Sequence, residues 1–190
     1  MSEKKNFRKQ FWKEKKTVGA MAPSSRFLTE KMLQHIDFKS AKIIIELGPG
    51  TGVFTDEIIS RMRNDATLLV FEVNDSFFEN LHKKVRDKRV HLIHDSAEKI
   101  EEYLQKYGFE KADVVVSSLP LAVFTPQLRN NILTASENAL TTSGKYIQFQ
   151  YSLQAKSLLK KLFKDVKIAF TPFNLPPAFV YTCTKKNPLH

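Results

Sequence analysis

The sequence predicts a doubly wound α/β fold, in which a mostly parallel seven-stranded sheet carries helices on both faces. Short apolar runs alternate with amphipathic stretches along the chain, as in folds built from successive strand–helix units. Several of the runs are continuously apolar, which is expected of strands that helices cover on both sides. Only a proline-rich turn separates the last two runs, so these two should form a C-terminal antiparallel hairpin at the sheet edge.

Each element follows from its local pattern. Ser25, after Pro23 and Ser24, can cap a helix over 25–36. The expected strands are 42–47, 67–73, 89–93, 112–117, 144–150, 166–171 and 178–184. The other expected helices lie near 53–63, 76–87, 96–107, 125–140 and 153–163. Lysines oppose the leucines of the last helix, and we expect its apolar side to pack on the sheet rather than on a membrane.

The composition is that of an ordinary cytoplasmic globular protein. The chain has 190 residues, 42% of them hydrophobic and 26% charged, and this length suits one domain. No apolar run approaches the roughly 18 residues that indicate a membrane-spanning helix, and the basic N-terminus lacks the apolar segment of a signal peptide. Cys183 is the only cysteine, so no internal disulfide is expected. No cluster has the spacing of metal ligands, and no metal is predicted.

Positive charge is concentrated at the N-terminus. The net charge of +10 favours polyanionic partners, either nucleic acid or an anionic membrane. Within residues 1–16, seven bases stand against two acids, a net charge of +5. These bases are Lys4, Lys5, Arg8, Lys9, Lys13, Lys15 and Lys16. We therefore divide the chain into a basic amphipathic arm, 1–24, and a catalytic domain, 25–190.

The arm has the pattern of a helix that lies on a membrane surface. As a helix it would place Phe7, Phe11 and Val18 on one stripe with Trp12 at its margin, and bases over most of the remainder. We predict that residues 4–18 become helical on anionic membranes. A helix along a phosphate backbone and a solvated tail are the alternatives. Because the predicted core begins near Ile43, deleting the arm should leave the fold intact.

A glycine-rich loop follows the first predicted strand. It runs Glu46-Leu47-Gly48-Pro49-Gly50-Thr51-Gly52, and its glycines allow a tight turn and close approach of a ligand. A dinucleotide site is the alternative, but its fingerprint needs glycine where Val53 stands, and Glu46 would face a pyrophosphate. An acidic loop suits a cationic ligand. S-adenosylmethionine, which carries an ammonium and a sulfonium, is the predicted cofactor.

Two further acids follow the next two strands. Glu72 ends the second strand, where a carboxylate can accept both ribose hydroxyl protons, as acids do in dinucleotide sites. Asp95 ends the third strand and is expected to accept a hydrogen bond from the adenine amino group, while Ser96 caps the following helix. Acids beyond the carboxyl ends of successive strands fit the rule for ligand position in open α/β sheets.

The loop from Glu46 to Gly52, followed by Val53-Phe54-Thr55, resembles motif I of class I, Rossmann-like methyltransferases. These include ribosomal RNA adenine dimethyltransferases and soluble bacterial phospholipid N-methyltransferases. Four further segments resemble the phospholipid enzymes more closely. They are Val18-Gly19-Ala20-Met21-Ala22-Pro23-Ser24-Ser25-Arg26, Ser117-Ser118-Leu119-Pro120-Leu121, Gln148-Phe149-Gln150-Tyr151-Ser152 and Asn174-Leu175-Pro176-Pro177-Ala178. The resemblance covers nearly the whole chain.

The residues after the fourth strand argue against adenine as the methyl acceptor. Enzymes that methylate a base amine resemble one another in an amide or acid followed by proline and an aromatic at this place. Here Ser118 stands at the amide position and Leu121 at the aromatic position, so a flipped base would lose a stacking contact worth about 1–3 kcal/mol. The RNA dimethyltransferases also share a helical C-terminal domain, whereas this sequence ends just after the final strand.

Three polar residues are the candidates for holding the acceptor amine: Ser118, Tyr151 and Asn174. Each can hydrogen-bond an amine, and the ring of Tyr151 can also face a methylated ammonium. The preferred interpretation is a peripheral membrane enzyme that methylates phosphatidylethanolamine or its methylated derivatives. An RNA N-methyltransferase and a non-catalytic cofactor-binding module are the alternatives.

Overall fold

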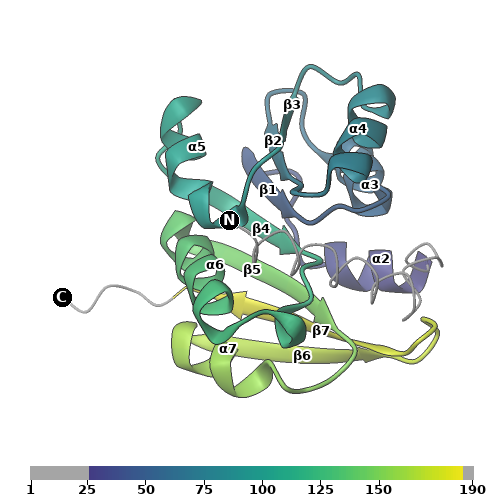
Figure 1. The fold of residues 1–190 in the computed structure, drawn as a ribbon, viewed down its shortest axis with the longest axis vertical. Coiled ribbons are helices and arrows are strands. Elements are labelled where there is room, and N and C mark those ends of the chain that lie inside the picture. Colours follow the sequence, from purple (N-terminus) through teal and green to yellow (C-terminus); the bar gives the residue numbers. More distant parts are fainter. Residues whose placement is uncertain (1–25, 186–190) are drawn as a thin grey trace.

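The computed structural model describes residues 26–185 and contains the predicted doubly wound sheet (Figure 1). Its strand order is β3-β2-β1-β4-β5-β7-β6, with β6 and β7 antiparallel. The strands are β1 (Ile43–Leu47), β2 (Thr67–Phe71), β3 (Val90–Ile93), β4 (Ala112–Ser117), β5 (Leu140–Gln150), β6 (Asp165–Thr171) and β7 (Ala178–Thr184). The α-helices are α2 (Arg26–Leu33), α3 (Val53–Arg61), α4 (Asp75–Lys84), α5 (Ile100–Lys106), α6 (Pro126–Ala139) and α7 (Lys156–Leu162). Two short 3₁₀ turns, η1 (Ala97–Lys99) and η2 (Leu121–Val123), complete the described elements.

Both faces of the sheet are buried, which explains the continuously apolar strands. In β1, the side chain of Ile44 belongs to one core cluster, and those of Ile45 and Leu47 belong to the other. Helices α2 and α3 cover the first cluster, while α5, α6 and α7 cover the second (Figure 1). Alternate residues of a strand point to opposite faces, so a strand covered on both sides needs apolar residues throughout.

The start of β5 and the start of the core differ from the sequence prediction. Strand β5 begins at Leu140, four residues before the predicted start, and its pairing with β4 shifts register between Ala112 and Val114. The core also begins before Ile43, because Leu28 and Met32 of α2 are fully buried. The predicted helix near 153–163 is α7, and Leu159 of α7 is buried in the core as expected.

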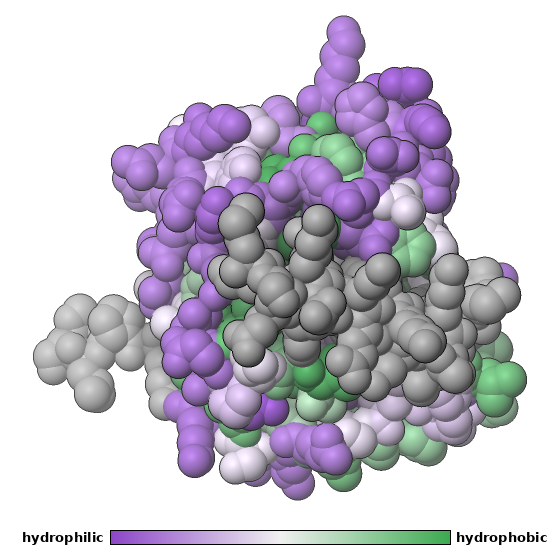
Figure 2. Space-filling model, viewed as in Figure 1, coloured by the Kyte–Doolittle hydropathy of each residue, from purple (hydrophilic) through white to green (hydrophobic). Residues whose placement is uncertain are grey.

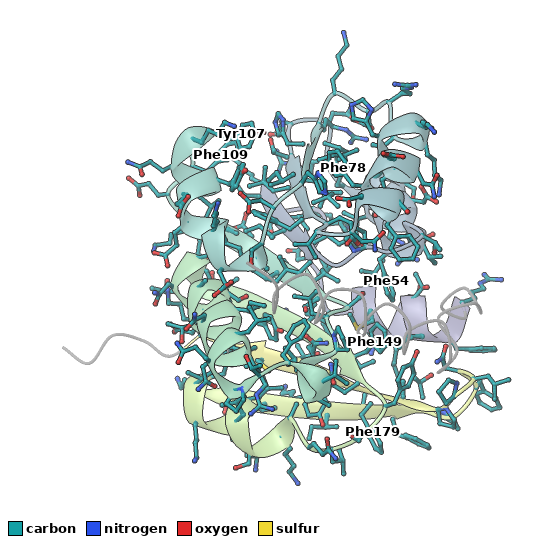
Figure 3. All side chains as sticks on the ribbon, viewed as in Figure 1. Phe54, Phe78, Tyr107, Phe109, Phe149 and Phe179 are labelled. Atoms are coloured by element: carbon teal, nitrogen blue, oxygen red, sulfur yellow. The ribbon has the colours of Figure 1, made fainter. Side chains whose placement is uncertain are left out.

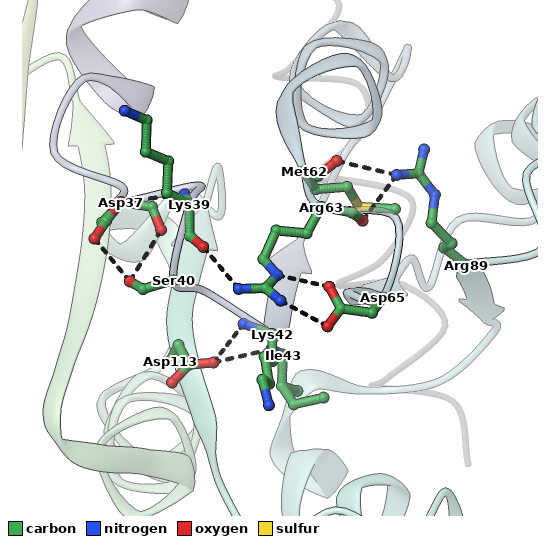
Figure 4. Close-up of polar contacts among 10 residues, drawn as sticks. All are labelled: Asp37, Lys39, Ser40, Lys42, Ile43, Met62, Arg63, Asp65, Arg89 and Asp113. Atoms are coloured by element: carbon green, nitrogen blue, oxygen red, sulfur yellow. Dashed lines mark hydrogen bonds and ion pairs between the residues drawn. The ribbon is translucent and has the colours of Figure 1, made fainter.

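Polar contacts connect the loops at the amino ends of the strands (Figure 4). One carboxylate oxygen of Asp113 accepts from the backbone amides of Lys42, at 2.8 Å, and Ile43, at 3.0 Å. Arg63 donates to both carboxylate oxygens of Asp65 and to the carbonyl of Lys39. These contacts fix the amino edge of the sheet, opposite the edge that carries the predicted site.

The basic arm, 1–24, lies outside the described residues. Within residues 26–185, no helix is both long enough and apolar enough to cross a membrane.

Candidate active site

The glycine loop turns tightly between β1 and α3. Gly48, Gly50 and Gly52 all have positive φ angles, of 68°, 59° and 82°. A Cβ atom on Gly48 would lie 2.7 Å from a methyl carbon of Leu119, in the loop that follows β4. The backbone conformation therefore favours glycine at this position, and a larger residue would also have to displace the side chain of Leu119 where the loops after β1 and β4 pack against each other.

Glu72 holds the glycine loop against the end of β2. Its side chain is buried, with one carboxylate oxygen accepting from the amide of Gly50 at 3.2 Å and the other from the amide of Asn74 at 2.8 Å. Asn74 in turn caps α4 by accepting from the amide of Phe77 at 3.0 Å. A carboxylate offers about four acceptor positions, and these two amides occupy one on each oxygen of Glu72.

Glu46 is fully buried below the loop. Its Oε2 accepts from the hydroxyl of Thr55 at 2.7 Å, and its Oε1 has no hydrogen-bond partner among residues 26–185. Burial, together with the nearby carboxylates of Glu72 and Asp56, raises the pKa of Glu46 to about 8, although the Thr55 bond opposes the rise. A buried acid with an unsatisfied oxygen is stabilised by a cation, and the predicted cofactor supplies one.

Asp95 lies after β3 and is held from three sides. Oδ2 accepts from Lys99 at 2.9 Å and from the Tyr103 hydroxyl at 3.1 Å, while Oδ1 accepts from the Ser96 amide at 2.7 Å. Partial burial opposes ionisation, but these hydrogen bonds lower the pKa of Asp95 below its ordinary value. Ser96 accepts from the amide of Glu98 and caps η1, as predicted.

The loop after β4 carries Ser118 and contacts the glycine loop directly. The Ser118 amide donates to the carbonyl of Leu47 at 2.9 Å, in line with the pairing of Ser117 and Leu47 across β4 and β1. The Ser118 hydroxyl is buried and has no hydrogen-bond partner within the described part of the chain. An unsatisfied hydroxyl at this position is suited to a ligand amine.

Two glutamines of β5 hold this loop, a role that the sequence reasoning missed. The amide groups of Gln148 and Gln150 both donate to the carbonyl of Leu119 at 2.9 Å, and the buried hydroxyl of Tyr146 donates to Oε1 of Gln148 at 2.7 Å. The only sequence signal for these hydrogen bonds was that the segment 148–152, which contains both glutamines, resembles the phospholipid N-methyltransferases.

Tyr151 and Asn174 lie together, although 22 residues separate them in sequence. The side chain of Asn174 is buried, donates to the carbonyl of Pro176 at 2.7 Å and hydrogen-bonds the Tyr151 hydroxyl. Desolvation raises the pKa of Tyr151, despite the bond with Asn174, so the phenol remains neutral at physiological pH. The ring of Tyr151 packs edge-on against the ring of Phe149, at 5.6 Å between centroids. The centroid of the Phe149 ring lies 6.1 Å from that of Phe54 in α3 (Figure 3).

The predicted residues thus form two groups at the carboxyl edge of the sheet. Glu46 lies near the carboxyl end of β1, Glu72 and Asp95 follow β2 and β3, and Ser118 joins them through the contact between the two loops. Tyr151 and Asn174 form the second group, beyond β5 and between β6 and β7. No group of three or more histidine, cysteine or acidic side chains in residues 26–185 has the arrangement of a metal site.

A model of the family described as ribosomal RNA adenine dimethylase matches residues 12–153. The chain belongs to this family. Membership of this family, together with the similar proteins described below, identifies the chain as an S-adenosylmethionine-dependent methyltransferase with a Rossmann-like, class I fold. The donor set fits that cofactor, because one oxygen of buried Glu46 has no hydrogen-bond partner among residues 26–185.

The proteins that are similar to this chain match different shares of its length. The sequence is 29% identical to ornithine lipid N-methyltransferase of Singulisphaera acidiphila over 92% of each chain. It is 36% identical to ribosomal RNA small subunit methyltransferase A of Sulfurihydrogenibium sp., over 38% of this chain and 27% of that enzyme. In structure, the fold resembles the N-methyltransferase NodS of Bradyrhizobium japonicum WM9, with a TM-score of 0.65, 10% identity and coverage of 86% and 89% of the two chains.

Proposed function

We propose that the protein methylates the headgroup amine of a membrane lipid, with phosphatidylethanolamine, its partly methylated derivatives or an ornithine lipid as acceptor. The observation that carries the proposal is the acceptor side of the site. There Ser118, Tyr151 and Asn174 offer small polar contacts, and Leu121 is buried where a base-methylating enzyme would present an aromatic ring. Similarity to ornithine lipid N-methyltransferase across most of both chains supports the same acceptor class.

The cofactor side of the site is proposed to bind S-adenosylmethionine through the predicted residues. Glu46 would face the cationic part, Glu72 the ribose hydroxyls, Asp95 and Ser96 the adenine end, and the backbone of Gly48, Gly50 and Gly52 would lie close against the ligand. When bound, this cofactor supplies an activated methyl group on a sulfonium. What remains for the protein is to align the acceptor and to exclude water.

The acceptor residues would orient a neutral amine. A lipid ammonium with a lysine-like pKa must lose its proton before its nitrogen can react. The hydroxyl of Ser118 and the side-chain oxygen of Asn174 can accept the amine N–H groups and so direct its lone pair. The neutral ring of Tyr151 can contact the cationic product through its π face. The N-terminal arm remains a sequence-based proposal for recruiting the enzyme to anionic membranes, where each base contributes about 1 kcal/mol.

RNA methylation is the second candidate function, because the matching family model describes ribosomal RNA adenine dimethylases. The relation to the ribosomal RNA enzymes is partial, and the first of them named above is covered over 27% of its length. A base would also need a stacking partner where Leu121 is buried.

Label transfer from S-adenosylmethionine tests the proposal. The purified protein is incubated with vesicles containing phosphatidylethanolamine, with vesicles containing an ornithine lipid, with vesicles of fully methylated phosphatidylcholine, and with ribosomal RNA. We expect label in one or both of the amine-containing lipids. Label in RNA alone would reverse the choice of acceptor, and label in none of the four would contradict enzymatic activity on either class.

A further inference from the structure

Three large apolar side chains are exposed together at the end of the molecule formed by α2 and the tip of the β6–β7 hairpin. Phe173 is 73% exposed, Leu175 is 82% exposed and Phe27 is 59% exposed, and we call them the apolar rim. The rings of Phe27 and Phe173 lie 5.2 Å apart between centroids. Hydrophobic surface is visible at this end of the molecule in Figure 2, where the hairpin tip of Figure 1 lies. Contiguous exposed apolar groups of this kind mark interaction surfaces.

The apolar rim directly adjoins the acceptor residues. Along the β6–β7 loop, Phe173 and Leu175 are exposed, whereas Asn174 between them is 5% exposed and bonded to Tyr151. The same three-residue segment therefore presents apolar groups to the outside and a polar group to the site. A surface that contacts Phe173 and Leu175 would therefore lie one residue away from Asn174, a proposed acceptor residue.

Basic side chains lie on the elements that carry the apolar rim. Lys31 is one helical turn from Phe27 on α2, so the two share a face. Lys31, Lys145 and Lys167 lie close enough to His35 to contribute, after burial, to lowering its pKa. Residues 151–185, which include α7 and the β6–β7 hairpin, contain six lysines and a single acid, Asp165, a net charge of +5, and none of these lysines lies in the loop between Thr171 and Ala178.

We propose that the apolar rim enters the interfacial region of an anionic bilayer, to which the positively charged elements that carry the rim are attracted, and so places the acceptor site at headgroup level. Exposed apolar groups on elements of net positive charge match the chemistry of such a surface, acyl chains beneath anionic headgroups. The proposal rests on the proposed lipid acceptor, and it adds a second membrane contact to the one expected of the basic arm. In this proposal the β6–β7 loop positions the acceptor site next to the membrane surface.

A single-tryptophan reporter tests insertion without reference to catalysis. Trp12 is the only tryptophan, so Trp12→Phe removes the background, and Phe173→Trp then places one reporter on the apolar rim. The matched control is Glu110→Trp, at an exposed position on the opposite, amino edge of the sheet. With anionic vesicles that carry brominated acyl chains, we expect a blue shift and strong quenching for the rim reporter and neither for the control. Equal behaviour of the two reporters would overturn the proposal.

The double variant Phe173→Ser with Leu175→Ser tests the consequence for turnover. On anionic vesicles we expect about a tenfold or greater loss of the methylation rate, the scale expected when two apolar side chains lose their burial. On a short-chain, monomeric lipid with the same headgroup, the rate should stay within about twofold, because the site itself is intact. Equal losses on both substrates would contradict the proposal. If wild-type protein methylates neither lipid, the proposed function fails, while the reporter experiment still decides whether the rim inserts.

Discussion

The polar groups of the proposed cofactor half of the sheet edge differ in their bonding from those of the proposed acceptor half. On β1–β3 the carboxylates are tied into the fold: Glu72 bridges two backbone amides, Asp95 accepts three hydrogen bonds, and Glu46 is bonded through one oxygen. On the β4–β7 side, Ser118 has a buried hydroxyl without a partner in residues 26–185, and the loop around Asn174 exposes apolar groups.

This difference separates residues that the fold itself holds in place from residues carried on loops. The proposed cofactor residues are bonded to the loops that surround them, so their positions are built into the fold. The acceptor residues are carried by the loops after β4 and β5 and between β6 and β7, and such loops change the substrate while the scaffold persists. The comparison predicts that damage to the two halves has separable effects on cofactor affinity and turnover.

The largest expected effect is on the cofactor half. Glu72→Ala removes a charged acceptor from the Gly50 and Asn74 amides and from the proposed ribose contacts. Charge-assisted hydrogen bonds contribute about 1.5–3 kcal/mol, so affinity for S-adenosylhomocysteine should fall by roughly a hundredfold or more in calorimetric titration. The matched control is Asp113→Ala, because Asp113 also accepts from two backbone amides, but at the amino edge of the sheet. Similar affinity losses in both variants would mean that the effect is a general loss of folding.

Glu46 should make the stability of the cofactor-free protein depend on pH. Its pKa of about 8 in the fold lies above the ordinary 4.5, so its contribution to the free energy of unfolding is fully present below about pH 4.5 and is lost as the pH rises through 8. The slope is at most about 1.4 kcal/mol per pH unit. Denaturant titrations across this window should show the wild type losing stability relative to Glu46→Gln. Parallel curves for the two proteins would show that Glu46 does not titrate as proposed.

On the acceptor half, Asn174→Ala should separate turnover from cofactor binding. Losing one hydrogen bond to the amine and the bond to Tyr151 should lower kcat by about tenfold, the scale of roughly 1.4 kcal/mol expected for one neutral hydrogen bond. Affinity for S-adenosylhomocysteine should not change. Steady-state kinetics with a lipid acceptor and calorimetry on the same preparation measure the two quantities. A parallel fall in cofactor affinity would place Asn174 in the cofactor half.

The smallest effect is expected at Asp95. Asp95→Ala should reduce cofactor affinity by only a few fold, because its proposed contact is with the adenine amino group, and Lys99 and Tyr103 lose a bonded partner that is partly exposed to solvent. Calorimetry on this variant and on Glu72→Ala ranks the two acids. A loss of cofactor affinity in Asp95→Ala as large as that in Glu72→Ala would contradict the proposed ranking of the two acids.

Sequence reasoning identified the alternation of elements, the glycine loop and the acids because each depends on local pattern. Gly48 is needed for its own backbone conformation, and Glu72 follows its strand directly. The hydrogen bonds from Gln148 and Gln150 to Leu119 could not be predicted, because their acceptor is a backbone carbonyl about 30 residues away in sequence. Any residue supplies such a carbonyl. The apolar rim was equally hidden, because exposure of a loop phenylalanine depends on tertiary packing.

The boundary at β5 was missed for a related reason. The sequence pattern ends the helix at 140 and leaves 141–143 outside any element, whereas pairing of Leu140 with Ala112 of β4 starts the strand four residues before Gly144. Neighbours across the sheet decided the outcome at this position, as they did for Tyr151 and Asn174, which meet through the antiparallel pairing of β5, β7 and β6.

A competition in one vessel tests the central claim, that the acceptor half is built for a lipid amine. Amine-containing anionic vesicles and ribosomal RNA are offered together to the full-length protein with S-adenosylmethionine, and mass spectrometry follows methylated headgroups and dimethyladenosine over time. We predict methylated lipid, no dimethyladenosine, and about tenfold slower formation of the lipid product in Asn174→Ala. Dimethyladenosine formed in preference to methylated lipid would contradict the account.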